Sequence, residues 1–299
     1  MKIKQLVVSA LFAALVPSLA VGAPLLHYNF NEASGNALDT GDAPPSDGAL
    51  NGGATRSSDT PGGFGSSLDL RDAAPAYAHV RATDPAKLDG VAALTVSTWL
   101  NLAAYPSTGD SNNARLIAKQ AAGTFGGFNF SLNGTPNDGT VGPDNFRLGL
   151  FLGNNVSSGP ADFGAAFSTA DADAANKWVF LAATYDSASA TGNTKFYIGG
   201  VNTPVTQLGA DLTLPQITVE GGTADFGVGF TAAAATADTS VQGLQDDVRV
   251  YGSALSLVEL EAVRLAGVIP EPGSLALASL GLAGLLAVRR RWGAINVNQ

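Results

Sequence analysis

Short segments of alternating apolar and polar residues, bounded by turn residues, run along this chain from residue 25 to about residue 267. Every second residue is apolar in residues 26–30, and residues 94–101 largely repeat the pattern. A period of two gives a strand one apolar face and is typical of half-buried sheets. Other strand-like segments are residues 68–71, 115–119, 127–132, 145–152, 178–186, 195–198, 225–230 and 244–251. Gly- and Pro-containing turn pairs separate them.

Helical periodicity is strong in only one late segment, residues 256–266. Ser256 suits the N-cap, Glu259 the first turn, and Gly267 is predicted to stop the helix. The apolar residues of one side are Leu257, Leu260 and Val263. Many short strands with one late helix predict an all-β fold, a two-sheet antiparallel β-sandwich with one short helix near its C-terminal end.

The N-terminus has the three parts of a secretory signal peptide. Lys2 and Lys4 precede an apolar run from residue 6 to residue 16, and small residues follow Pro17. We expect cleavage after Ala20 or Gly22, and therefore a signal peptide over residues 1–22. The alternative is an uncleaved anchor, but the run is shorter than the roughly 20 residues that cross a bilayer.

The C-terminus carries Pro270-Glu271-Pro272-Gly273, an apolar run over residues 274–288, and then Arg289, Arg290 and Arg291. The run is predicted to form a short transmembrane helix, with the arginines on the cytoplasmic side and the globular domain outside. The prolines end any preceding helix. Because the run is short for a permanent span, it suits a transient sorting helix better than a durable anchor.

This order resembles the PEP-CTERM sorting signal of Gram-negative bacteria, here residues 268–299. The resemblance implies that a membrane enzyme, the exosortase, recognises Pro270, Glu271 and Pro272, while the arginine cluster orients the helix. It also implies export through the inner membrane to the surface or matrix of biofilm-forming cells. Gly293 to Gln299 extend past the arginines, which leaves a plain membrane anchor as the alternative.

The body of the chain, residues 23–267, resembles the laminin-G-like, concanavalin A-like jelly roll. The resemblance lies in residues 26–32, in Leu94-Thr95-Val96-Ser97-Thr98-Trp99-Leu100, in residues 178–186 with 195–200, and in Asp246-Asp247-Val248-Arg249-Val250-Tyr251. Two positions depart from the family pattern. Gln245 stands where an aliphatic residue is usual, and Gly199 stands where Asp is common.

Charge and composition exclude several classes of function. Five of the 16 basic residues lie in the two terminal segments, which leaves 11 against 25 acidic residues. Such an acidic domain repels phosphate backbones, so nucleic acid is not an expected partner. The absence of cysteine excludes thiol nucleophiles and Cys-ligated zinc. The acidic surface serves solubility or, alternatively, holds divalent cations.

Catalytic patterns are missing from the sequence. A retaining glycosidase needs two carboxylates about 5 Å apart, yet neither Glu32 nor Glu220 has a carboxylate two residues away. Glu259 and Glu261 fall on the predicted helix. His27 and His79 are the only histidines, and His27 is expected to be a solvated strand residue. We therefore predict a protein that is not an enzyme, with a degenerate glycosidase or lyase as the least favoured alternative.

Calcium is the one cofactor that the sequence suggests. Asp246 shares the parity of Val248 and Val250, so on a regular strand it points inward. A buried carboxylate must be paired, hydrogen-bonded or metal-bound. In laminin-G-like domains the equivalent Asp joins a calcium site or bonds loop backbone. Glu32, at the end of the first predicted strand, is the expected partner. A satisfied structural carboxylate is the alternative.

These observations predict an exported surface or matrix protein that binds a glycan or a partner protein. A ligand-free spacer or surface-layer component is the alternative. Trp99 and Trp178 are expected in the core, and the polar loops of residues 105–113 and 133–145 are expected to carry binding surfaces.

Overall fold

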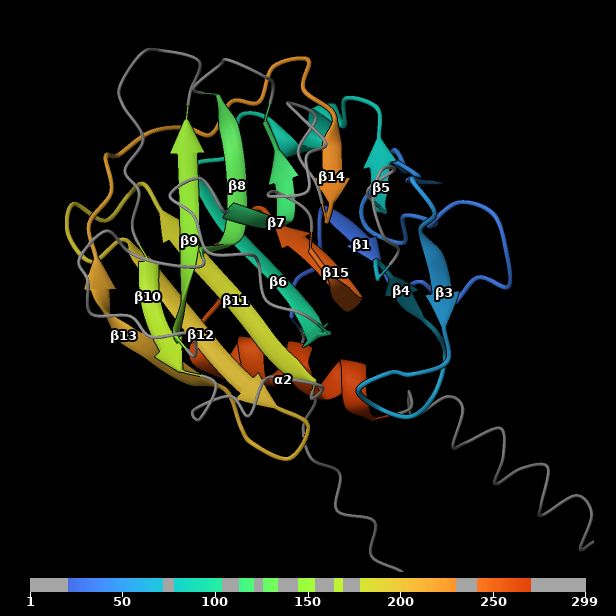
Figure 1. Cartoon of the computed structure of the whole chain (residues 1–299). Coiled ribbons are helices and arrows are strands. Elements are labelled where there is room, and N and C mark those ends of the chain that lie inside the picture. Colours follow the sequence, from blue (N-terminus) through green and yellow to red (C-terminus); the bar gives the residue numbers. More distant parts are fainter. Residues whose placement is uncertain are drawn as a thin grey trace, which may run out of the picture.

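The computed structural model describes residues 21–71, 78–103, 113–120, 126–133, 145–153, 164–168, 178–229 and 241–269. Within them the chain forms two antiparallel sheets stacked face to face (Figure 1), which confirms the predicted sandwich. The predicted C-terminal hydrophobic helix and the signal peptide's first 20 residues lie outside these ranges. No helix among the described residues has the length and apolar character needed to cross a bilayer.

The first sheet has eight strands, in the order β13-β12-β11-β6-β15-β4-β3, with β1 added to β15. These strands are β1 (Leu26–Tyr28), β3 (Thr55–Ser57), β4 (Ser67–Asp69), β6 (Ala93–Leu102), β11 (Val179–Asp186), β12 (Thr194–Gly200), β13 (Thr206–Leu212) and β15 (Gly243–Tyr251). The first and the last strand of the described chain are therefore neighbours, and Leu26 lies opposite Val250.

The second sheet has seven strands, in the order β10-β9-β8-β7-β14-β5-β2. They are β2 (Ala49–Asn51), β5 (His79–Ala82), β7 (Asn113–Lys119), β8 (Gly127–Asn133), β9 (Asn145–Gly153), β10 (Gly164–Ser168) and β14 (Phe226–Val228). A short 3₁₀ turn, η1 (Ala86–Leu88), lies between β5 and β6.

The main core fills the space between the sheets. Alternate residues of β8 and β15, among them Phe128, Phe130, Val248 and Val250, point into it and are fully buried. Each such side chain contributes about 1.5–3 kcal/mol by leaving water. The alternation seen in the sequence therefore reflects this layer. Gln245 also lies between the sheets, where its Nε2 donates to the Leu116 carbonyl of β7 at 3.3 Å.

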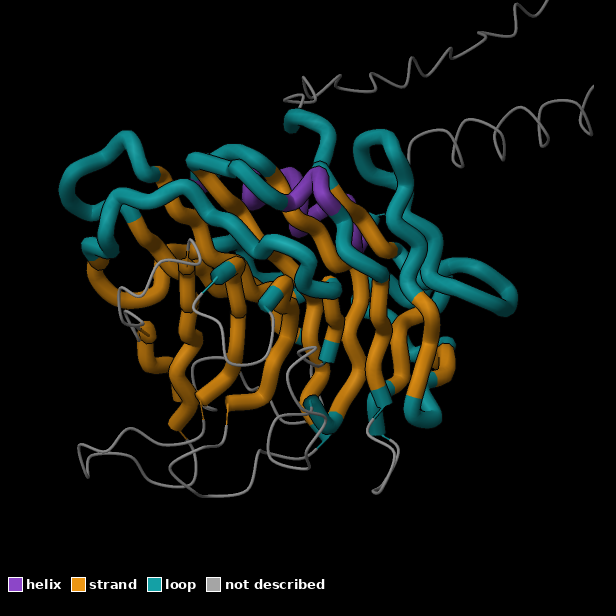
Figure 2. The backbone as a smooth tube through the Cα atoms, turned by 90° about the horizontal axis from the view of Figure 1, so that it is seen from above, coloured by secondary structure: helices purple, strands orange, loops and turns teal. Residues whose placement is uncertain are grey.

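A second apolar cluster lies on the outer face of the eight-stranded sheet, beneath helix α2 (Leu257–Val268). Figure 2 shows α2 along this face, with the other sheet on the opposite side of the sandwich. Trp99 of β6 and Phe180 of β11 meet edge to face, with ring centroids 5.5 Å apart. Leu260 and Val263 of α2 cover them. Trp99 is fully buried, as predicted, but under the helix rather than between the sheets.

Helix α2 begins as predicted and ends later. Ser256 accepts a hydrogen bond from the Glu259 N–H, and the Glu259 side chain caps Ser256 in return. The helix continues through Gly267 to Val268, so the predicted stop at Gly267 was wrong. Ile269 is extended, as expected for a residue that precedes a proline, and Pro270 is what ends the helix.

Candidate functional site

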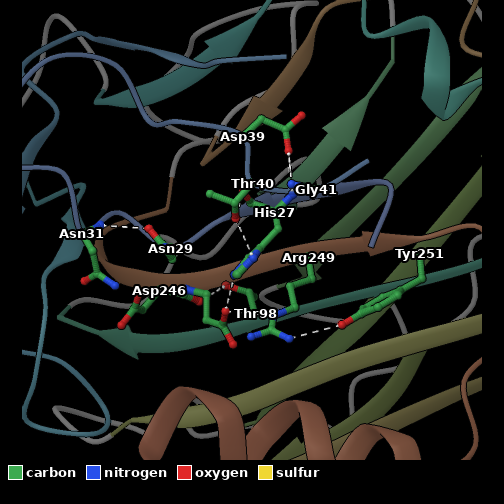
Figure 3. A network of polar contacts seen from close by, with 11 residues as sticks. His27, Asn29, Asn31, Asp39, Thr40, Gly41, Thr98, Asp246, Arg249 and Tyr251 are labelled. Atoms are coloured by element: carbon green, nitrogen blue, oxygen red, sulfur yellow. Dashed lines mark hydrogen bonds and ion pairs between the residues drawn. The ribbon is translucent and has the colours of Figure 1, made fainter. Parts of the chain in front are cut away.

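A network of polar side chains joins the first strand to the last (Figure 3). The Nε2 atom of His27 lies 2.7 Å from Oδ1 of Asp247, and its Nδ1 lies 2.9 Å from the Thr40 hydroxyl. Arg249 donates to the same Asp247 oxygen at 2.9 Å. The expectation of a solvated His27 was wrong, because β1 pairs with β15 and brings the ring against Asp247.

A bulge in β15 sets the direction of Asp246. The register against β6 shifts between Asp246 and Arg249, and Asp247 has a positive φ of 49°. Asp246 lies opposite Trp99, and directly paired residues share a face of the sheet. Asp246 is buried as predicted, but on the helix-covered face, so the expectation that it points between the sheets was wrong.

The pKa values of the two adjacent aspartates are shifted in opposite directions. Burial, with the nearby charge of Asp247, raises the pKa of Asp246 well above its ordinary value. Burial would also raise the pKa of Asp247, but Arg249 and His27 outweigh it and lower that pKa. Acid–base catalysis uses pairs of carboxyl groups whose pKa values are shifted apart in this way. Here both carboxyls are buried.

The C-terminal end of α2 closes this site. A Cβ atom on Gly267 would lie 2.5 Å from the indole nitrogen of Trp99 and 3.3 Å from Oδ2 of Asp247. Both of those polar atoms are buried without a hydrogen-bond partner. Glycine is therefore required at 267 for the helix to approach the sheet this closely.

Glu32, the expected partner of Asp246, is bound elsewhere. Its Oε1 accepts the Leu38 N–H at 2.7 Å, and its Oε2 pairs with Arg56 at 2.8 Å. Asp246 instead accepts the Asp247 N–H at 2.8 Å. In the part of the chain that the structure describes, the two share no partner, and no three His, Asp or Glu residues gather as a metal site. The residues present do not fit the expected calcium pair, and calcium stays a prediction.

Lysine ammonium groups neutralise other buried carboxylates. Lys87 pairs with Asp39, whose oxygens also accept backbone N–H groups from His27, Gly41 and Ser46. The Asp39 side chain is fully buried, and it holds the turn that follows β1.

A second internal lysine links β7 to the loops beside it. Lys119 is fully buried, and its Nζ contacts Asp89 at 2.6 Å, Asp84 at 3.3 Å and the Gly222 carbonyl at 3.0 Å. A buried charge held in this way is structural, because breaking one partner leaves the other uncompensated.

One polar pocket opens at the N-terminal end of α2, with a volume of about 430 Å³. It lies over the ends of β11, β12 and β13, and its lining includes Asp186, Asn193, Lys195, Tyr197, Gln207 and Ser256. Asn193 is fixed through both amide atoms to Leu214. Lys195 and Gln207 are more exposed and both contact Asp211, at 3.1 and 2.7 Å. Sequence reasoning missed this pocket, because residues from four separate segments form it.

A shallower pocket of about 550 Å³ lies beside the Glu32–Arg56 pair and is lined by residues including Asn36, Leu50 and Thr55. The Arg56 guanidinium is already bound to Glu32 and to three backbone carbonyls. It has little capacity left for a ligand.

The two positions that depart from the family pattern have local explanations. Gln245 is bonded between the sheets, as described above. A Cβ on Gly199 would lie 2.9 Å from Cδ of Arg264, whose guanidinium bonds to Gly200 and Val201 carbonyls. An Asp side chain has no room there. The predicted sorting residues Pro270–Pro272 and Arg289–Arg291, and most of the two predicted binding loops, lie outside the described residues.

Two family models match the chain. The model of the concanavalin A-like lectin/glucanases superfamily matches residues 74–261, and the PEP-CTERM protein-sorting motif matches residues 268–291. No curated protein matches the sequence significantly.

Solved structures share the fold at low sequence identity. The receptor-binding domain of botulinum neurotoxin type G matches with a TM-score of 0.51 and 13% identity, over 82% of this chain and 51% of its own. The binding domain of Paraclostridial mosquitocidal protein 1 gives 0.54 and 10%, over 81% and 52%. A botulinum neurotoxin DC binding domain, in complex with SialylT, gives 0.52 and 12%, over 82% and 51%. This chain spans about half the length of these structures, and the likeness shows the fold alone.

Proposed function

The chain belongs to the concanavalin A-like lectin/glucanases superfamily, and on that premise we propose that it binds a polysaccharide at the cell surface without cleaving it. The carbohydrate is expected to be an exopolysaccharide of the surrounding matrix. The observation that carries the proposal is the polar pocket between β11, β12, β13 and the start of α2, which we call the α2 pocket.

The α2 pocket has the size and chemistry that a sugar unit needs. Its volume of about 430 Å³ falls within the range of roughly 300–1,000 Å³ typical of small-ligand sites. Carboxylate, amide, ammonium and hydroxyl groups line it, and these are the groups that bond sugar hydroxyls. Lys195 and Gln207 are exposed enough to exchange Asp211 for a ligand.

Binding is favoured over hydrolysis by the state of the acidic residues. Among the described residues, Asp39, Asp89 and Asp247 each contact a lysine, an arginine or a histidine. Asp246 has the raised pKa of a general acid but is buried. The proposal therefore assigns no catalytic residue.

The sorting motif supports display outside the inner membrane. A PEP-CTERM motif at residues 268–291 fits export followed by handling by an exosortase-like enzyme. The predicted signal peptide over residues 1–22 would direct that export. Cell entry of one structural neighbour, botulinum neurotoxin type C, depends on interaction with two ganglioside molecules. That supports a carbohydrate ligand here by analogy of fold only.

Co-sedimentation with purified bacterial exopolysaccharide tests the proposal. The double substitution Lys195→Ala with Gln207→Ala should reduce retention strongly, because it removes two exposed hydrogen-bonding groups of the pocket. The matched control is Arg71→Ala, an exposed ion-paired residue of the same domain that lies outside the pocket. Equal retention of the two variants would show that the ligand does not bind in this pocket.

The ligand-free spacer is the second outcome of that experiment. No retention of the unaltered protein by any matrix polysaccharide, with or without calcium, together with self-association of the purified chain, would support the spacer and contradict the proposal.

A further inference from the structure

Exposed apolar side chains concentrate at helix α2. The described residues include five large hydrophobic side chains that are exposed, and Leu257, Val258 and Ile269 are on α2 or at its end. A fourth, Val201, has its carbonyl bonded to Arg264 of the helix at 3.1 Å. Three of the five are therefore on the helix or at its end, and a fourth belongs to a loop that is hydrogen-bonded to it. Leu38, in the loop after β1, is the exception.

The outer side of the helix is an apolar stripe. Val258, Ala262, Leu265 and Ile269 are spaced by four, three and four residues, which places them on one side of a helix. Val258 is 57% exposed and Ile269 is 49% exposed. The inner side, with Leu260 and Val263, is buried on the sheet. A helix that is apolar on both sides usually lies between two apolar neighbours, and the sheet is only one of them.

The charges beside the stripe are already satisfied. Glu259 is bound to Ser256 in the capping box, and Glu261 pairs with the buried Arg264 at 2.6 Å. The stripe itself contains no ionisable side chain. This surface therefore enters a less polar environment at small electrostatic cost.

The position of the C-terminal tail indicates which surface the apolar stripe contacts. Five residues, Ile269 to Gly273, separate the helix from the apolar run that starts at Ser274. Fully extended, five residues reach roughly 18 Å. The described N-terminal end lies on the same side, since Val21 and Val268 both pack against the cluster beneath α2. Both targeting segments therefore join the domain at its helix-covered face.

We propose that the apolar stripe of α2, formed by Val258, Ala262, Leu265 and Ile269, lies on the lipid surface while the C-terminal tail is inserted in the membrane. The eight-stranded sheet then faces the bilayer and the seven-stranded sheet faces away from it. Interfacial helices bury their apolar side roughly 5–10 Å into the headgroup boundary. The α2 pocket lies beside the helix on this same face, so the orientation applies while the tail is inserted, and the proposed glycan binding applies once the tail no longer holds this face on the lipid.

Depth-dependent quenching tests the orientation, and the cysteine-free sequence makes single-cysteine labelling direct. The full chain with its tail is reconstituted in phosphatidylethanolamine–phosphatidylglycerol vesicles that carry a doxyl group near the headgroup end of the acyl chain. Bimane is attached at Val258→Cys on the stripe, at Thr83→Cys beyond β5 of the other sheet, and at Ala283→Cys in the tail. Both body positions are exposed, so labelling leaves the fold intact.

We expect marked loss of fluorescence at positions 258 and 283 and none at 83. Val258→Asp, read from a label at Ala266→Cys, should reduce quenching there while leaving the unfolding temperature unchanged. Quenching at 283 alone, or equal quenching at 258 and 83, overturns the proposal. So does absence of quenching at 283, which removes the tether. Rapid disulfide formation between two Val258→Cys chains without lipid quenching would assign the stripe to a second copy and also overturn it.

Polysaccharide co-sedimentation of the same labelled variants separates the two proposals. Retention that persists while quenching fails contradicts only the orientation. Quenching that persists while retention fails contradicts only the glycan ligand.

Discussion

His27 Nε2 and Asp247 Oδ1 lie 2.7 Å apart, within hydrogen-bonding distance, and join two strands although the residues are 220 positions apart in sequence. The contact helps to hold β1 on the eight-stranded sheet, because β15 is the only strand that β1 pairs with in the described structure. Asp247 also binds Arg249, so one buried carboxylate holds two basic groups. The main role of the segment Asp246-Asp247-Val248-Arg249 is therefore structural: it joins the first strand of the domain to the last.

Asp247→Asn should destabilise the domain by about 3–5 kcal/mol, because it leaves the Arg249 charge buried without its partner. Asp69→Asn is the matched control, since Asp69, at the end of β4, pairs with a basic residue two positions later, but the Arg71 side chain is 47% exposed. An exposed pair contributes only about 0–1 kcal/mol. Urea denaturation gives both values, and equal losses would contradict the structural role assigned to Asp247.

Asp246→Asn should have the opposite effect at neutral pH. The raised pKa of Asp246 means that the folded state binds more protons than the unfolded state above the ordinary carboxyl pKa of about 3.9. The free energy of unfolding therefore falls as pH rises from there through the raised pKa. Asparagine removes this loss and keeps an oxygen for the Asp247 N–H.

Urea denaturation between about pH 5 and pH 8, where an ordinary carboxyl is already ionised, checks this prediction. The Asp246→Asn variant should show a flatter stability profile and a higher free energy of unfolding at neutral pH. A less stable variant with an unchanged slope would refute the assignment.

Gly267→Val should displace the end of α2, because its Cβ would meet Trp99 at 2.5 Å. Overpacking of this kind costs about 1–3 kcal/mol. Ala266→Val adds the same side chain one residue earlier, where the position is exposed, and should leave stability nearly unchanged. Thermal unfolding compares the two, with Trp99 fluorescence as a local report. Equal stability of both variants would show that the helix end is not packed on the sheet.

Chelation of calcium should leave the unfolding temperature unchanged. Arg56 neutralises Glu32, and burial raises the pKa of Asp246, which favours its uncharged form, so these two residues have little negative charge left for a metal to satisfy. The measurement is thermal unfolding in excess EGTA and after calcium is restored. A reversible fall in EGTA would instead support the calcium site expected at Asp246 and Glu32.

The regular strands were predictable because their apolar residues alternate against one core. β6, β11, β12 and β15 have nearly the predicted bounds, and Ser256 caps α2 as expected. Strands such as β13 were missed. Its residues are mostly exposed at a sheet edge and Gly209 interrupts them, so no apolar alternation marks it.

The site was less predictable because it depends on irregular backbone and distant pairing. Parity fails for Asp246 since the bulge at Asp247 interrupts the strand period. No local signal indicates that His27 meets Asp247, because the contact follows from the pairing of the first and last strands. The α2 pocket likewise forms only when four segments come together.

Chemical-shift mapping during titration with oligosaccharides from matrix exopolysaccharide tests the central claim most directly. Saturable shifts are predicted at residues 184–197, at Gln207 and at residues 254–257, which surround the α2 pocket. The absence of any shift, or shifts confined to the seven-stranded sheet, would contradict the account.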